Sequence, residues 1–309
     1  MPAASWNVVS DADSRARARA IELARGDRLL CIVGPTASGK TELALATCEA
    51  VGGEIVSADS VQIYRGFDIG SGKPTREEAA RARHHLVDTH DPLDSIDAAG
   101  WAKLAEAAIE DIRSRGKIPI VCGGTFFWVR ALVLGLVEAP AADPAIRARH
   151  RALADEKGRA ALHEELARVD PASAQRLHPN DFVRVSRALE VHELSGRTMS
   201  DWQASHGFKT TRFDAAMIGL EHDPAGLTTR IGARVDRWLA EGWLDEVRAL
   251  LDAGYAEARA MGSVGYAEVR THLEGTLSRD ELRDAIVRST RVFARRQRTW
   301  LNSAAVEWL

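Results

Sequence analysis

The chain has 309 residues, 45% of them hydrophobic, and a formal net charge of −3, so it can fill a sizeable core and a disordered chain is excluded. Its three cysteines are far apart and form no CxxC pair, which disfavours a structural zinc site and favours a reduced, cytoplasmic protein. No apolar run is long enough to cross a membrane, so we expect no membrane partner. We also expect the protein to be a monomer.

The first predicted strand, residues 29–33, leads into a phosphate-binding loop and a helix. The loop follows the pattern of Gly, four residues, Gly, Lys and Thr. Its glycines allow backbone N–H groups to surround an anion, and the helix dipole points to the same place. Lys40 adds a full charge, and the Thr41 hydroxyl can hold Mg²⁺. The pattern predicts a diphosphate or triphosphate ligand and leaves the reaction open; its residues are Gly34, Pro35, Thr36, Ala37, Ser38, Gly39, Lys40 and Thr41.

A second short strand, residues 54–57, runs directly into Ala58 and Asp59. In open parallel sheets ligands lie beyond the carboxyl ends of strands, so we expect Asp59 to face the same crevice as Lys40. A carboxylate there could hold Mg²⁺, directly or through water, or accept a proton from a nucleophile. The alternative is a residue that only caps a turn.

A polar glycine loop, residues 68–74, precedes a helix that Thr75 and Glu78 open as a capping box. Histidines and aspartates gather between residues 84 and 91 around a strand-like pair, Leu86 and Val87. Their spacing is not that of a helical metal site, so we do not expect one. Helical periodicity follows over residues 96–115.

The next predicted strand, residues 118–122, ends in Gly123, Gly124 and Thr125. A typical phosphate-loop NTPase would end such a strand in Asp, so its absence weakens an ATPase or kinase interpretation. The glycines would let a ligand approach the backbone closely, and Thr125 offers a hydroxyl. A simple turn is the alternative.

Between residues 140 and 211 the sequence changes to consecutive helical patterns, at 144–156, 159–169, 171–177 and 182–194. Asp-Pro pairs mark two of the starts. The segment is rich in Arg and His, and such charges usually form a solvated helix face paired with Glu and Asp. A strand at 215–220 then returns to the sheet. We therefore predict an α/β fold with a P-loop NTPase-like core of parallel strands, residues 1–140 and 213–309, and an inserted all-helical domain, residues 141–212.

Two helices complete the core. The first begins after Asp223-Pro224 and contains Arg230 and Arg234, which could bind phosphate oxygens if they face the crevice. The second, residues 281–301, carries six arginines and ends near Trp300. Concentrated Arg with an aromatic side chain suits nucleic acid, and an amphipathic helix with a wet basic face is the alternative.

Ten motifs in fixed order carry a family resemblance, at residues 34–41, 57–66, 68–74, 123–125, 142–147, 178–190, 230–236, 264–266, 290–291 and 295–300. With them the chain resembles tRNA dimethylallyltransferases, also called tRNA isopentenyltransferases. The resemblance implies magnesium-dependent transfer of a dimethylallyl group from dimethylallyl diphosphate to N6 of the adenine just 3′ of the tRNA anticodon. The phosphate-binding loop would then hold diphosphate rather than ATP.

The resemblance also implies residue roles. Asp59 is the expected general base, Thr41 the Mg²⁺ position, Thr125 a contact near the reacting adenine, and Arg234 a diphosphate contact. The helical insertion is expected to clamp the anticodon stem-loop against the core. Expected tRNA contacts are Asp59, Ser60, Val61, Gln62, Thr125, Arg147, Val183, Arg184, Val185, Ser186, Arg187, Gly262, Ser263, Val264, Gly265, Tyr266, Arg295, Arg296, Gln297, Arg298, Thr299 and Trp300.

The chain departs from the family pattern at bulky positions rather than charged ones. These departures leave the shape of the prenyl or nucleotide pocket open, while Asp59 and the loop are unaffected. The substituted positions are Trp101, 126–128, Trp238, Trp243 and Phe293.

Three other functions stay open. An enzyme that prenylates free adenine nucleotides would not need the helical insertion or the Arg-rich end. A nucleoside or small-molecule kinase would bind ATP. A non-catalytic RNA-binding NTPase would keep full function without Asp59.

Overall fold

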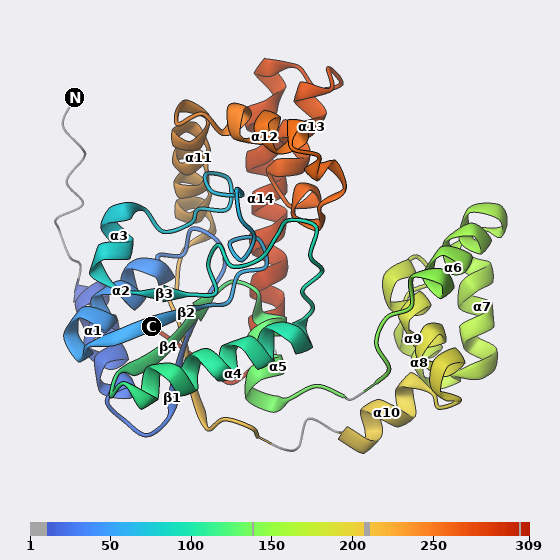
Figure 1. The fold of residues 1–309 in the computed structure, drawn as a ribbon, viewed down its shortest axis with the longest axis horizontal. Coiled ribbons are helices and arrows are strands. Elements are labelled where there is room, and N and C mark those ends of the chain that lie inside the picture. Colours follow the sequence, from blue (N-terminus) through green and yellow to red (C-terminus); the bar gives the residue numbers. More distant parts are fainter. Residues whose placement is uncertain (1–10, 138, 207–210, 303) are drawn as a thin grey trace. The chain divides into compact units, whose positions relative to one another are not determined.

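The computed structural model describes residues 11–137, 139–206, 211–302 and 304–309 (Figure 1). It divides into two compact units, one of residues 1–133 and 213–309 and one of residues 134–212. The first unit contains a six-stranded sheet in the order β3-β2-β4-β1-β5-β6, and every neighbouring pair is parallel. The predicted α/β fold with a parallel sheet is confirmed. None of the described helices combines the length and apolarity needed to span a bilayer.

The central strands are apolar and buried, as expected for strands covered on both faces. The strands are β1 (Leu29–Val33), β2 (Gly53–Ser57), β3 (His84–His85), β4 (Ile118–Gly123), β5 (Ala215–Gly219) and β6 (Val306–Trp308). The prediction of a strand at Leu86 and Val87 is wrong, because Leu86 has φ 61°, which ends the extended backbone after His85.

Helices cover the sheet. Helices α1 (Asp11–Ala24) and α2 (Lys40–Val51) pack on one face, where Leu30, Ile32 and Ile120 join their core. On the other face α4 (Ala98–Ser114) contacts β2 and β4. Its buried Trp101 donates to the Ser57 carbonyl and stacks on Trp128 of α5 (Phe126–Leu134) with ring centroids 5.3 Å apart. The short α3 (Arg76–Arg81) opens with the predicted capping box at Thr75.

The remaining helices of the first unit pack together (Figure 1). Asp223 caps the first of them, as the sequence predicts, and Ser278 caps the last. The elements are α11 (Pro224–Ala240), α12 (Trp243–Asp252), η1 (Tyr255–Glu257), η2 (Arg259–Gly262), α13 (Tyr266–Leu273) and α14 (Arg279–Leu301).

Within its described residues the second unit consists of helices and connecting loops without a strand, and it has its own core around Leu162, Leu166 and Leu189. The helix starts at residues 144, 159, 171 and 182 fall where the sequence predicts them, and Asp143, Asp170 and Asp181 each cap the helix that follows. The sequence does not predict the helix at Met199–His206. The helices are α6 (Pro144–Lys157), α7 (Arg159–Val169), α8 (Pro171–Arg176), α9 (Phe182–Ser195) and α10 (Met199–His206).

One buried carboxylate joins the sheet to α4. Glu54 of β2 accepts two hydrogen bonds from Arg115, which follows α4, and a 2.7 Å bond from His85 of β3. Arg115 chiefly, together with His85, holds the pKa of Glu54 at about 2, below its usual value. The pairing therefore ties two strands and a helix end together.

We predict that Glu54→Gln lowers the free energy of unfolding by about 1–3 kcal/mol at neutral pH. Because the folded-state pKa is depressed, the lost stability is fully present above about pH 4.5 and disappears as the pH falls towards 2. Urea unfolding of both proteins between about pH 2.5 and 7 measures the difference. Glu49→Gln, which breaks an exposed pair with Arg81, is the control and should cost less. Equal losses for the two variants would contradict the prediction.

Candidate active site

The register of the sheet brings three predicted motifs to one edge. Val33 pairs with Gly123, and Ser57 pairs with Cys122, so β1, β2 and β4 end side by side. The phosphate-binding loop, Asp59 and Thr125 each follow one of these strand ends. Gly123 fits only as glycine, because a Cβ there would lie 2.2 Å from the Ala58 carbonyl oxygen.

These strand ends form the floor of a cavity of about 840 Å³ within the first unit. Its walls come from the 68–75 loop, α11, the 262–264 segment and α14. Of the predicted site residues, the cavity is lined by Thr36, Ala37, Ser38, Gly39, Lys40, Thr41, Asp59, Ser60, Val61, Gln62, Thr125, Arg234, Gly262, Ser263, Val264 and Gln297.

The phosphate-binding loop wraps tightly before α2. Ala37 and Gly39 have positive φ, and the Ser38 N–H donates to the Pro35 carbonyl at 3.3 Å. Ser38 Oγ is buried and has no hydrogen-bond partner within the described residues. Thr41 is exposed to the cavity at the start of α2. The loop thus presents hydroxyl groups and a helix start to any anion above it.

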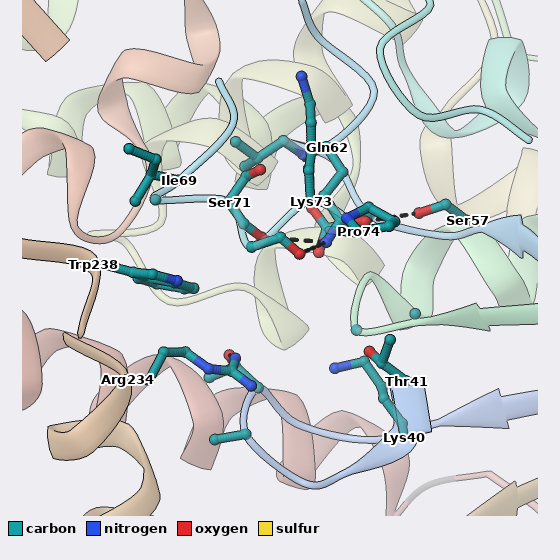
Figure 2. A pocket seen from close by; sticks show the side chains of 18 of the residues that line it. Lys40, Thr41, Ser57, Gln62, Ile69, Ser71, Lys73, Pro74, Arg234 and Trp238 are labelled. Carbon is teal, nitrogen blue, oxygen red and sulfur yellow. Dashed lines mark hydrogen bonds between the residues drawn. The ribbon is translucent and has the colours of Figure 1, made fainter. Parts of the chain in front are cut away.

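Two cations face one another across this loop. Figure 2 shows Lys40 and Arg234 pointing toward each other. Lys40 Nζ donates to the Pro35 carbonyl at 3.3 Å, and Arg234 Nη1 donates to Thr36 Oγ1 at 3.2 Å. Burial first, and then the charge of Arg234, lowers the pKa of Lys40; burial and Arg237 lower the pKa of Arg234. An anion between the two would offset both penalties.

Asp59 lies beside the phosphate-binding loop, and its two carboxylate oxygens have different surroundings. Its Oδ1 accepts from the Val61 and Gln62 amides at 2.9 and 3.2 Å, the turn-capping role that the sequence left open. Its other oxygen has no hydrogen-bond partner among the residues that the structure describes. Thr125 Oγ1 accepts from the Ser60 amide at 3.1 Å, which fixes the neighbouring turn. A carboxylate oriented in this way can accept a proton without losing its turn.

Two further residues, whose roles sequence reasoning missed, hold the cavity walls. Gln297 of α14 accepts from the Thr36 amide and donates to the Gly124 carbonyl, both at 2.9 Å. Glu246 of α12 accepts from the Asp68 and Ile69 amides and from the Tyr266 hydroxyl. Burial raises the pKa of Glu246. Gln297 lies within the 295–300 motif, where the sequence suggested a tRNA contact, and no motif surrounds Glu246, so only the tertiary structure reveals these hydrogen bonds.

Two tryptophans that depart from the family pattern line the same cavity. Trp238 lies beside Arg234, with the guanidinium carbon 5.4 Å from its ring centroid (Figure 2). Trp243 is buried and packs edge-on against Trp238. Both rings press on the 68–74 loop, since a Cβ at Gly70 would meet Trp243 at 2.1 Å and one at Gly72 would meet Trp238 at 3.0 Å.

The other predicted residues lie elsewhere. Gly265 and the buried Tyr266 do not line the cavity, and Arg295 and Arg298 line a different one. In the second unit Arg147 and Arg187 both bind the fully buried Glu190. Val183 and Arg184 are exposed there, whereas Val185 and Ser186 are buried in the unit's core.

Known proteins share this sequence and fold. The family model described as IPP transferase matches residues 62–304. A tRNA dimethylallyltransferase of Sorangium cellulosum is 66% identical over 281 residues, covering 91% of this chain and 90% of that protein. One of Geobacter sulfurreducens is 47% identical, covering 91% of each.

Solved structures agree. The tRNA isopentenylpyrophosphate transferase of Bacillus halodurans has a TM-score of 0.67 and 36% identity over 92% of this chain and 90% of its own. A eukaryotic dimethylallyltransferase, described as acting on tRNA, has a TM-score of 0.77 and 26% identity over 92% of this chain and 74% of its own.

We predict that Gln297→Ala weakens binding of inorganic diphosphate about five- to tenfold, because the lost hydrogen bond to Thr36, worth about 1 kcal/mol, no longer fixes the loop. Isothermal titration calorimetry in the presence of Mg²⁺ measures the affinity. Arg296→Ala, an exposed position on the same helix outside the cavity, is the control. Unchanged affinity in Gln297→Ala would contradict the positioning role.

Proposed function

Because the chain belongs to the IPP transferase family, with tRNA dimethylallyltransferases as its relatives, we propose residue roles for that reaction in this cavity. The enzyme transfers a dimethylallyl group from dimethylallyl diphosphate to N6 of the adenine 3′-adjacent to the anticodon in tRNA. The observation that carries the proposed roles is the shared cavity, in which Asp59 faces the same space as Lys40 and Arg234.

The adenine N6 attacks C1 of the donor while the bond from C1 to the diphosphate oxygen breaks. Diphosphate leaves with the bonding electrons, and Lys40, Arg234 and the loop amides stabilise its growing charge. The free oxygen of Asp59 takes the N6 proton. An exocyclic amine is a weak nucleophile, so removal of this proton during attack favours the product. Thr125 supports the turn that carries Asp59.

Mg²⁺ fits the oxygen groups of this site. Thr41 is exposed to the cavity at the loop's end, and we propose it as the protein ligand, with Asp59 reaching the ion through water. No cluster of three or more His, Cys, Asp or Glu that could hold a metal occurs in the described part of the chain. The ion would therefore be held mainly by diphosphate oxygens, as Mg²⁺ commonly is. When bound it adds positive charge beside the leaving group.

The tRNA anticodon stem-loop is the proposed partner, and the reacting adenine must leave its stack to reach Asp59. Exposed or cavity-lining side chains could contact it directly, as at Ser60, Val61, Arg184 and Arg296. Val185, Ser186 and Tyr266 are buried, so we propose that they support the contact surface. A monomeric state and a cytoplasmic location belong to the same proposal.

Asp59→Asn is the sharpest test of the base. Its amide oxygen can still accept from Val61 and Gln62, so the turn survives, but the side chain can no longer take a proton. We expect kcat to fall about 10²- to 10⁴-fold, far more than tRNA affinity falls. Single-turnover transfer with labelled donor, and filter binding of tRNA, measure the two quantities.

Asp97→Asn is the matched control, because Asp97 caps α4 through the Gly100 amide in the same way and lies outside the cavity. It should leave kcat unchanged. Transfer by Asp59→Asn at the wild-type rate would reject Asp59 as the base.

Mass spectrometry of anticodon-loop fragments identifies the modified base. AMP and ATP as substrates test the nucleotide-prenylating and kinase alternatives.

A further inference from the structure

A second cavity, of about 400 Å³, lies between α11 and α14. Thr290, Phe293 and Gln297 of α14 face the catalytic cavity, so this helix separates the two spaces. The second cavity is lined on the opposite side of α14 by residues three and four apart, which lie on one helix face. We call them the arginine face: Arg288, Arg291, Arg295 and Arg298.

The arginine face has no acidic ion-pair partner in the part of the chain that the structure describes. Arg283, on the same helix, pairs with Asp236, but no ion pair to the arginine face occurs within the described residues. The four guanidinium groups extend over about 15 Å of helix and repel one another. A surface with this arrangement is stabilised by anions that come from outside the chain.

The remaining residues that line the second cavity include aliphatic side chains and one histidine. Leu227 and Ile231 of α11 and Val292 of α14 give it an aliphatic floor. His222 also lines it, and its Nδ1 donates to the Leu220 carbonyl at 2.9 Å. Its Nε2 is buried and has no partner within the described residues. Burial lowers the pKa of His222, so the neutral ring leaves Nε2 as an unsatisfied acceptor.

We propose that this cavity is a second binding site, for a nucleoside phosphate. The arginine face would hold the phosphate, the aliphatic floor would take the sugar or base, and a hydroxyl or amino group of the ligand would satisfy His222. A bare phosphate ion would contact only the arginine face. Pro35 of the phosphate-binding loop also lines the cavity, so its occupancy adjoins the catalytic loop.

A nucleoside phosphate has two possible sources. One is a nucleotide of the tRNA other than the reacting adenosine, and this source rests on the proposed function. The other is a free mononucleotide. Because Arg288 and Arg291 lie outside the expected tRNA contacts at 295–300, they test the cavity separately from those contacts.

The test is the double variant Arg288→Gln/Arg291→Gln in the full chain. The control is Arg113→Gln/Arg279→Gln, which removes the same charge from exposed positions outside both cavities. Filter binding of a tRNA transcript over a range of salt concentrations gives affinity and salt dependence. Calorimetric titration with AMP gives mononucleotide affinity, and thermal unfolding checks the fold of each variant.

If the source is tRNA, the double variant should bind it at least tenfold more weakly, with a salt slope lower by about 1.4, and AMP binding should equal that of the control. If the source is a free mononucleotide, AMP binding should weaken at least tenfold. Unchanged binding of both ligands relative to the control would overturn the proposal. Binding is measured without turnover, so a failed transfer assay would reject the proposed function and leave this result standing.

Discussion

Two half-buried cations that face one another, with no ion-pair partner among the described residues, set the conditions for the whole candidate site. Lys40 and Arg234 come from different ends of the chain, and each is held by a neutral oxygen of the phosphate-binding loop. Their arrangement is costly until an anion arrives, and the diphosphate of the proposed reaction would offset that cost. The surrounding elements act mainly to keep these groups in place.

The arrangement of the site depends on the pairing register of the parallel strands. The strand ends of β1, β2 and β4 must coincide, because a slip of one residue would turn every side chain to the other face. The close approach at Gly123 enforces the fit between β4 and the Ala58 backbone. Gln297 then locks α14 onto the loop from 261 positions further along the sequence. The proposed catalytic groups therefore come from separate segments of the chain, and distant elements such as α14 hold them in place.

Much of this could be predicted from local signals. Apolar runs located β1 and β4, aspartates before proline located two of the insertion helices, and the glycine spacing located the phosphate-binding loop. The strand at His84–His85 could not be located from the sequence. The apolar pair Leu86 and Val87 suggested a strand one step later, but the backbone leaves the extended region at Leu86. Glu246 and the orientation of Gln297 were equally hidden, since their partners are backbone groups far away in sequence.

The stacking of Trp101 on Trp128 gives two of the departures from the family pattern a common cause. One ring fills the space that the other requires, and Trp101 is also anchored to the Ser57 carbonyl at the end of β2. Neither substitution would be expected to persist without its counterpart, because a lone indole would face either a void or a clash. The pair should therefore be inherited as a unit, and grafting a single tryptophan into a relative should reveal epistasis between α4 and α5.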